Sequence, residues 1–310
     1  MTTACSCNYG LGNSKTPSCV PLMGVTHTLI FVPYFTSAGV KNGINLSTAD
    51  LDSTYFSALT AQSDRALRWR PVNTGKKFES VNINRSEAKY KEYESGERYF
   101  IQSGSKSFEG VLPHAPTGLI KFFDSARCEK MGVFIVDRDG NLVGNMSTAG
   151  YLYPFRVADQ SINADFMHAK DGDLAEVKIR FGFDSTEDDG DIGLIENTEM
   201  SYDVRLLEGL YDTYGSFTSI TATGWILDHR TNYGTAKNPN RVTGMVLGDF
   251  TLINRASGAS IVITTVTEST VTPGVYTFVI PSTAAAKLKL SFTYAGYDSN
   301  QLSTQVIETP

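Results

Sequence analysis

Metal binding is the first chemistry that the residue types of this chain suggest. Cys5, Cys7 and Cys19 lie close together in the sequence, and His27 is the nearest histidine. Zinc sites usually draw their cysteines from C-x-x-C pairs, and this sequence contains none. We therefore predict that these cysteines are free thiols in a protein made in a reducing cytoplasm.

Two acidic segments suggest calcium. The segment Asp137–Asn141 begins like a calcium-binding loop but lacks the distal glutamate, so we interpret it as a hairpin turn. The charges of Asp184–Asp191 crowd together, a pattern that is typical of a solvated loop. We expect neither a metal nor a cofactor.

Catalytic residues form no recognisable arrangement. The histidines are scattered along the sequence, at His27, His114, His168 and His229. The chain has no G-x-S-x-G nucleophile elbow and no glycine-rich phosphate loop between a strand and a helix. We predict that the protein is not an enzyme.

Composition and charge exclude two further classes. The 310 residues carry 27 Lys+Arg against 33 Asp+Glu, a net charge of −6, which argues against a conventional basic nucleic-acid binder. The one basic and aromatic cluster is Arg65, Arg68 and Arg70 around Trp69, and we interpret it as packing at a helix end. No apolar run approaches the roughly 20 residues of a membrane span, so we expect no membrane partner.

The first two thirds of the chain predict strands with two short helices. Apolar residues at Leu51, Tyr55 and Leu59 indicate a helix that starts at Ser47 or Thr48 and ends near Gln62. The other predicted elements are a strand Thr28–Tyr34, a helix Gly118–Arg127, a hairpin Met131–Gly144 and a strand Ala175–Phe183.

One segment, Lys76–Ile101, has the alternation of a long hairpin with a turn at Ser95 and Gly96. Its polar and charged residues fall on both faces, whereas a strand packed on its own core is apolar on one face. Such a hairpin either lines a wet channel or pairs with a neighbouring subunit.

From Ser216 the sequence is rich in Ser and Thr and poor in charge. Short strands recur at regular spacing, and Trp225 is the candidate centre of their core. The predicted strands are Thr218–Leu227, Gly244–Ile253, Ser260–Thr267, Val275–Ile280, Lys287–Tyr294 and Ser303–Ile307. This pattern predicts an immunoglobulin-like β-sandwich at 216–310, behind a first β domain at 1–215.

The segment Lys76–Gly144 resembles bacteriophage major tail tube proteins. It holds the charged hairpin, the run Gly104–Gly110, the second helix and the following hairpin. The segment Val242–Tyr297 resembles the immunoglobulin-like sandwiches on phage tails and capsids. The resemblance implies a mainly β fold, with a tail-tube-like β-sandwich or barrel, a flanking helix and a long hairpin, followed by an Ig-like domain.

This resemblance also implies a function. Hexameric rings of the protein would stack into a tail tube that conducts DNA in the virion, after assembly in the host cytoplasm. The partners would be the chain itself, other tail proteins and passing DNA that is not specifically bound. Candidate lumen or inter-subunit residues are Glu79, Glu87, Lys89, Lys91, Glu92, Glu94, Glu97 and Arg98. Among them, Lys89, Lys91 and Arg98 would pair with glutamates across subunits.

Two other functions fit parts of the sequence. A capsid decoration or virion surface protein would use the sandwich but give the polar hairpin no role. A glycan-binding adhesion module would use exposed aromatic residues such as Tyr233, Tyr294 and Tyr297 as its platform.

Overall fold

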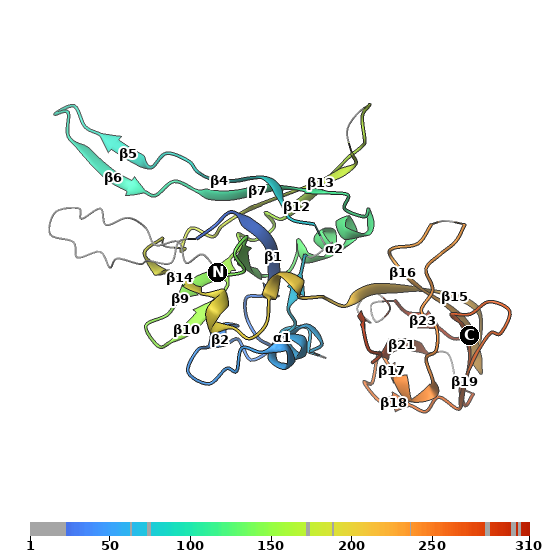
Figure 1. The fold of residues 1–310 in the computed structure, drawn as a ribbon. Helices are drawn as coiled ribbons and strands as arrows, with labels where there is room; N and C mark the ends of the chain where they lie inside the picture. The colour runs from blue at the N-terminus through green and yellow to red at the C-terminus, as the bar shows by residue number, and fades with distance from the viewer. Residues whose placement is uncertain are drawn as a thin grey trace. The chain divides into compact units, whose positions relative to one another are not determined.

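The chain is mainly β and divides into two compact units in a computed structural model (Figure 1). The first unit comprises residues up to Ala115 and Phe123–Gly209, and the second comprises Pro116–Phe122 and the residues from Leu210. The boundary therefore precedes Gly215, because a strand of the second unit already runs through that glycine. The structure describes residues 23–62, 64–72, 76–171, 174–187, 189–235, 237–282, 286–298, 302 and 305–310, so that Cys5, Cys7 and Cys19 lie outside it.

The first sheet of the first unit is centred on β8 (Met131–Asp137), in which every residue is buried. It pairs with β1 (Thr26–Pro33) on one side and with β9 (Leu142–Met146) on the other. The remaining strands are β2 (Ile44–Asn45), β3 (Arg70–Pro71), β10 (Tyr151–Tyr153), β11 (Phe155–Arg156) and β14 (Ile192–Ile195).

The predicted hairpin Met131–Gly144 is confirmed as β8 and β9. In its turn, the buried Asp137 carboxylate accepts hydrogen bonds from the backbone N–H groups of Gly24, Asp139 and Asn141. Backbone donors satisfy this carboxylate, so the segment is a structural turn, as its sequence predicts.

The first helix, α1 (Ser53–Thr60), begins later than its sequence pattern predicts. The predicted N-cap at Ser47 or Thr48 is wrong, because Asp52 caps the helix and accepts a hydrogen bond from the Tyr55 N–H at 2.8 Å. After the helix, Trp69 stacks on Phe134 with ring centroids 4.7 Å apart, which agrees with a packing role for the basic and aromatic cluster.

The second sheet of the first unit has the strand order β12-β13-β7-β4. Its strands are β4 (Glu79–Arg85), β7 (Lys106–Pro113), β12 (Asn163–Met167) and β13 (Glu176–Gly182). The two sheets meet at Phe181, whose ring stacks on Phe108 at 4.9 Å and meets the edge of Phe31 at 5.7 Å. The helix α2 (Gly118–Ala126) places Phe123 against the same Phe31 ring, at 5.6 Å.

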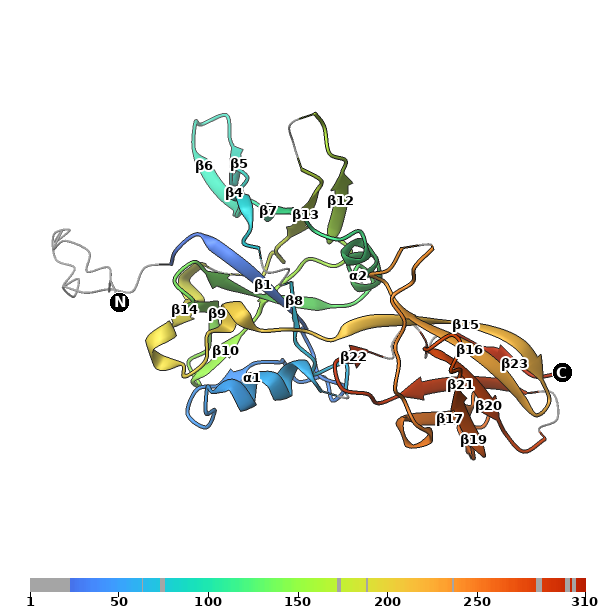
Figure 2. The ribbon, with the colours of Figure 1, turned by 45° about the vertical axis from the view of Figure 1, so that its right-hand side comes forward.

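Beyond β4 and β7 the hairpin continues as a separate two-stranded ribbon, β5 (Lys89–Glu92) and β6 (Arg98–Gln102). Figures 1 and 2 show this ribbon extending away from the sheets of its unit. Every residue of β5 and β6 is exposed. The predicted long hairpin is therefore confirmed, with its return strand running to Pro113.

The second unit is a sandwich of two sheets, with strand orders β19-β20-β16-β15-β22 and β18-β17-β21-β23. The predicted strand Thr218–Leu227 is two strands that reverse at Ala222 and Thr223. The strands are β15 (Tyr211–Thr221), β16 (Gly224–Thr231), β17 (Phe250–Asn254), β18 (Ser260–Ile261), β19 (Thr265–Glu268), β20 (Val275–Val279), β21 (Lys287–Phe292), β22 (Tyr297–Asp298) and β23 (Ile307–Glu308).

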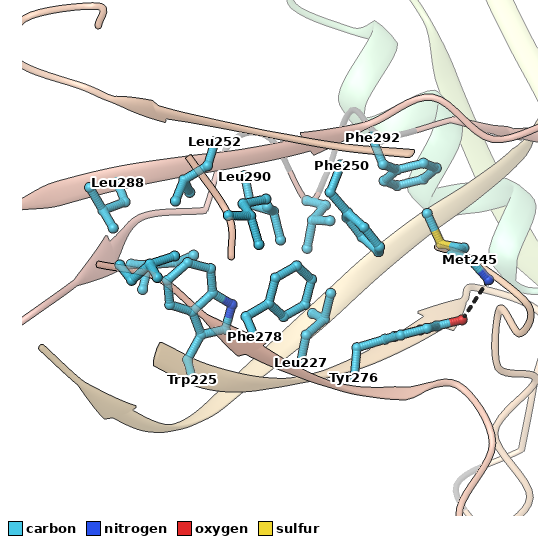
Figure 3. Close-up of a cluster of buried hydrophobic side chains, with 14 of the residues drawn as sticks. Trp225, Leu227, Met245, Phe250, Leu252, Tyr276, Phe278, Leu288, Leu290 and Phe292 are labelled. Carbon is cyan, nitrogen blue, oxygen red and sulfur yellow. Dashed lines mark hydrogen bonds between the residues drawn. The ribbon is translucent and has the colours of Figure 1, made fainter. Parts of the chain in front are cut away.

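The core of the sandwich lies between its two sheets (Figure 3). Trp225 stacks on Phe278 with ring centroids 5.3 Å apart, and Phe250 of the other sheet meets the edge of Phe278. The Tyr276 hydroxyl is also buried there and donates to the Val242 carbonyl at 2.8 Å. Trp225 therefore occupies the core position that its sequence context predicts.

The sandwich core also encloses His229, which has no exposed surface. Its ring meets the edge of Phe292 at 4.8 Å, and neither ring nitrogen has a hydrogen-bond partner within the described residues. Burial lowers the pKa of His229 to about 4, because the charged imidazolium would lose its hydration.

Removing the ring at the junction of the two sheets tests the packing of the first unit. We expect Phe181→Ala to lower the free energy of unfolding by about 3–5 kcal/mol, because it leaves a cavity among three aromatic rings. Arg180→Ala is the matched control on the exposed face of the same strand, and its cost is expected to stay below about 1 kcal/mol. Denaturant unfolding measures both, and equal losses would contradict the packing described.

Acid tests the buried histidine. The unfolded chain protonates His229 near pH 6.5 but the folded chain only near pH 4, so stability is lost as the pH falls through this interval. We expect the second unit to lose about 3 kcal/mol there. The loss should disappear in His229→Leu. The neighbouring Asp228 affects the pH dependence of stability only below this interval, because the hydrogen bond from Arg230 lowers its pKa to about 2. Unfolding at pH 7 and pH 4.5 measures the difference.

Candidate assembly surface

The sheet β12-β13-β7-β4 has two chemically different faces. Residues directly opposite in antiparallel strands share a face, and alternate residues of β7 and β13 are buried against the first sheet. The other side is here called the charged sheet face. It consists of Glu79, Asn82, Asn84, Ser107, Glu109, Val111, Pro113, Asn163, Asp165, Met167, Glu176, Lys178, Arg180 and Gly182.

Ion pairs connect neighbouring strands across the charged sheet face. Lys178 pairs with Glu109 of β7 at 2.5 Å, and Arg180 pairs with Asp165 of β12. Exposed pairs of this kind contribute less than about 1 kcal/mol each to stability. Their larger effect is on the charge of the surface, because both cations are neutralised while Glu79 and Glu176 add further carboxylates to the face.

The strands at the two ends of this sheet each have a neighbour on one side only, within the part of the chain that the structure describes. β4 pairs with β7, and β12 pairs with β13. An open strand edge presents N–H and C=O groups in the pattern that a further strand can bind. The sheet can therefore accept another strand at either end.

Aromatic side chains are exposed on the ribbon β5–β6. Tyr90 lies opposite Phe100 with ring centroids 6.0 Å apart, and the ring of Tyr93 meets that of Tyr99 at 5.4 Å. These four rings and Ile101 are each 48–60% exposed. A two-stranded ribbon is marginally stable alone, and this one has no apolar support within the described residues. It is therefore an exposed aromatic surface, a kind of surface that is typical of interaction sites.

The structure places the predicted lumen or inter-subunit residues along this hairpin. Glu79 lies in β4 and pairs with Lys77 at 3.4 Å, while Glu87 lies between β4 and β5. Lys89 opposes Gln102, and the Lys91 ammonium lies 4.8 Å from the centre of the Tyr93 ring.

The remaining predicted residues lie near the tip of the ribbon. Arg98 pairs with Glu92 of its own chain at 3.1 Å, directly across the ribbon. Glu94 lies in the turn, and the Glu97 carboxylate accepts a hydrogen bond from the Tyr99 hydroxyl at 3.0 Å. Arg98 therefore already forms an ion pair within its own chain, while Lys89 is exposed on the ribbon.

Sequence reasoning missed two parts of this surface. The first is the pair of exposed rings of Tyr99 and Phe100, which lie in β6 after the turn. The sequence interpretation of the hairpin considered its charged residues and not these rings. The cations Lys178 and Arg180 alternate with buried residues in the predicted strand Ala175–Phe183, so period-two alternation could have assigned them to one face.

The acidic segment after β13 closes the base of the hairpin. Asp189 pairs with Arg85 of β4 at 2.9 Å and with Lys106 of β7 at 2.8 Å. The hydrogen bond from Lys106 lowers the pKa of Asp189. Burial raises the pKa of Glu187, which accepts hydrogen bonds from the Arg156 N–H and the Asn145 amide. These carboxylates thus have structural partners.

Metal-binding clusters and membrane-spanning helices are absent from the described residues. Among the described residues, no group of three or more His, Cys, Asp or Glu side chains could hold a metal ion. No helix in the same residues is long and apolar enough to cross a membrane. In comparisons with protein-family models, with curated proteins and with solved structures, none matched this chain.

Proposed function

We propose that the protein is a structural virion protein whose copies assemble into rings, and that the rings stack into a phage tail tube that conducts DNA. One observation carries the proposal. The sheet β12-β13-β7-β4 is apolar on its core face and charged on the other, and it continues into an exposed aromatic ribbon. Both of its edges are open within the described part of the chain. Each of these features is completed by a second copy of the chain.

In this proposal, pairing between strand edges of neighbouring copies forms the ring. The β12 edge of one copy would meet the β4 edge of the next, so each interface is head-to-tail. Head-to-tail contacts close into a ring when the rotation between copies divides the circle, and closure leaves no free strand edge. The number of six copies follows from the resemblance to tail tube proteins.

The charged sheet face would line the channel. DNA phosphates bind tightly to free lysines and arginines, through the release of counterions. On this face Lys178 and Arg180 are each paired with a carboxylate, and Glu176 leaves an excess of negative charge. Such a wall would let DNA pass without holding it.

The second unit has a core of its own, so it would not belong to the wall of the tube. A capsid decoration protein could use the same sandwich. That alternative gives no role to Tyr90 and Phe100 of the first unit, whose rings are exposed. The assembly proposal accounts for both units.

Replacing Lys89–Gln102 with an Asn-Gly turn tests the role of the ribbon. The backbone hydrogen bond between Ser86 and Ser105 keeps β4 and β7 paired, so each subunit should still fold. We expect rings and tubes for the unchanged protein in negative-stain electron microscopy across a concentration series, and none for the variant. The exposed-site control Val271→Ala should assemble normally. Tubes formed by the shortened protein would refute the role of the ribbon.

Truncation after Gly209 tests the role of the second unit. Because β15 starts at Tyr211, this cut removes the sandwich without dividing a strand. We expect rings of the truncated chain to form at the same protein concentration as rings of the complete chain. Loss of assembly in a truncated protein that is folded by circular dichroism would place the sandwich in the wall.

A further inference from the structure

Four tyrosines from distant parts of the sequence come together on the second unit. Tyr211 and Tyr297 are paired residues of the parallel strands β15 and β22. Tyr233 follows β16, and Tyr294 follows β21. The ring centroids are 5.9 Å apart from Tyr233 to Tyr211, 5.8 Å from Tyr211 to Tyr297, and 5.8 Å from Tyr297 to Tyr294. We call this continuous series the tyrosine row.

The backbone fixes the rings in place. Tyr294 and Tyr297 bracket a tight turn, in which the Tyr297 N–H donates to the Tyr294 carbonyl at 3.2 Å. Gly296 in this turn has φ +85°, a conformation that favours glycine, and its carbonyl accepts a hydrogen bond from the Tyr211 N–H at 2.8 Å. The Tyr294 hydroxyl donates to the Thr243 carbonyl at 3.2 Å. The row is therefore preorganised.

The tyrosine row is not part of the buried core. Tyr211 is 54% exposed and Tyr233 is 36% exposed, whereas the core tyrosine Tyr276 has no exposed surface. Tyr294 and Tyr297 are half-buried, with part of each ring on the sandwich core. Grouped exposed aromatic rings on a soluble domain are a feature of binding surfaces. Tyrosine suits such surfaces because a rigid ring offers contact area at a low cost in conformational entropy.

The electrostatics of the row indicate the class of ligand. Burial, followed by the negative charge of Asp212 and by Tyr211, raises the pKa of Tyr233 to about 12. Its hydroxyl, like that of an unshifted tyrosine, is a neutral hydrogen-bonding group at physiological pH. The four tyrosine side chains supply rings and neutral hydroxyls, and none of them is a cation that would attract an anionic ligand. A neutral ligand with apolar faces and many hydroxyl groups fits these properties.

We propose that the tyrosine row is a binding site for neutral carbohydrate. The C–H faces of successive sugar rings would pack on successive tyrosine rings, and the tyrosine hydroxyls would hydrogen-bond to the sugar hydroxyls. The four successive rings offer more contact area than one sugar covers, which suits an oligosaccharide better than a single sugar. This site is independent of ring assembly, since all four tyrosines lie in the second unit.

Isothermal titration calorimetry of the complete chain tests the proposal in either assembly state. The probes are linear neutral oligosaccharides built from glucose or mannose, with oligogalacturonate as the acidic comparison. We expect at least one neutral series to bind, with affinity rising with oligosaccharide length, and oligogalacturonate not to bind. Absence of binding by every neutral series, or equal binding of the acidic one, would overturn the proposal.

Variants locate the binding. Tyr211→Ala should weaken binding about five- to tenfold, whereas Tyr211→Phe keeps the ring and most of the affinity. Tyr233→Ala gives a second test at the end of the row if Tyr211→Ala does not fold by circular dichroism. Val271→Ala is the control, since this side chain is 91% exposed elsewhere in the same unit. Unchanged affinity in a folded alanine variant of the row would place the sugar elsewhere and refute the assignment.

Discussion

Backbone hydrogen bonding at strand edges governs the architecture of the first unit. A strand buries its side chains by packing on a second layer, but its N–H and C=O groups are satisfied only by a strand beside it. In the first sheet the two sides of β8 are occupied by β1 and β9. In the second sheet the end strands β4 and β12 keep one side open within the described residues. The self-assembly proposed above would satisfy the charged face, the open edges and the exposed ribbon at once.

The same strands carry the core and the charged surface. In β13, Val177, Ile179 and Phe181 are buried, while Lys178 and Arg180 lie between them on the opposite face. A shift of one residue in the pairing would place charges in the core, so the aromatic stack of Phe181 and Phe108 fixes the register. The ion pairs of Lys178 and Arg180 depend on this register, because they join residues of adjacent strands. Core packing thus determines the charge pattern of the exposed face.

Much of this fold could be predicted from local sequence patterns. Period-two alternation predicts the strand around Ile179, and the Asp-Gly-Asn turn predicts the hairpin of β8 and β9. The predicted start of α1 at Ser47 or Thr48 is wrong, because several residues before the helix have side chains that can cap it. In the structure the Ser47 N–H donates to the Asn45 side chain, and Asp52 caps the helix. The chain reverses at Ala222 and Thr223, neither of which is Gly or Pro, so the sequence predicts one continuous strand there instead of two. The sequence suggests Tyr233, Tyr294 and Tyr297 as an aromatic platform but not Tyr211, because the contact of Tyr211 with Tyr297 joins residues more than 80 positions apart, which no local pattern carries.

The open edges also have a consequence for the chain before it meets its neighbours. An edge that can pair with a specific partner can also pair with a wrong one and begin an open-ended aggregate. The bulge in β4 at Ser80, where φ is +50°, interrupts regular pairing along that edge, and exposed charges at Glu79 and Arg85 flank it. These irregularities discourage indiscriminate strand addition while leaving the edge available to a partner of matching shape. If the subunits assemble as proposed, the strand that joins them into a ring would thus also disfavour fibril formation before assembly.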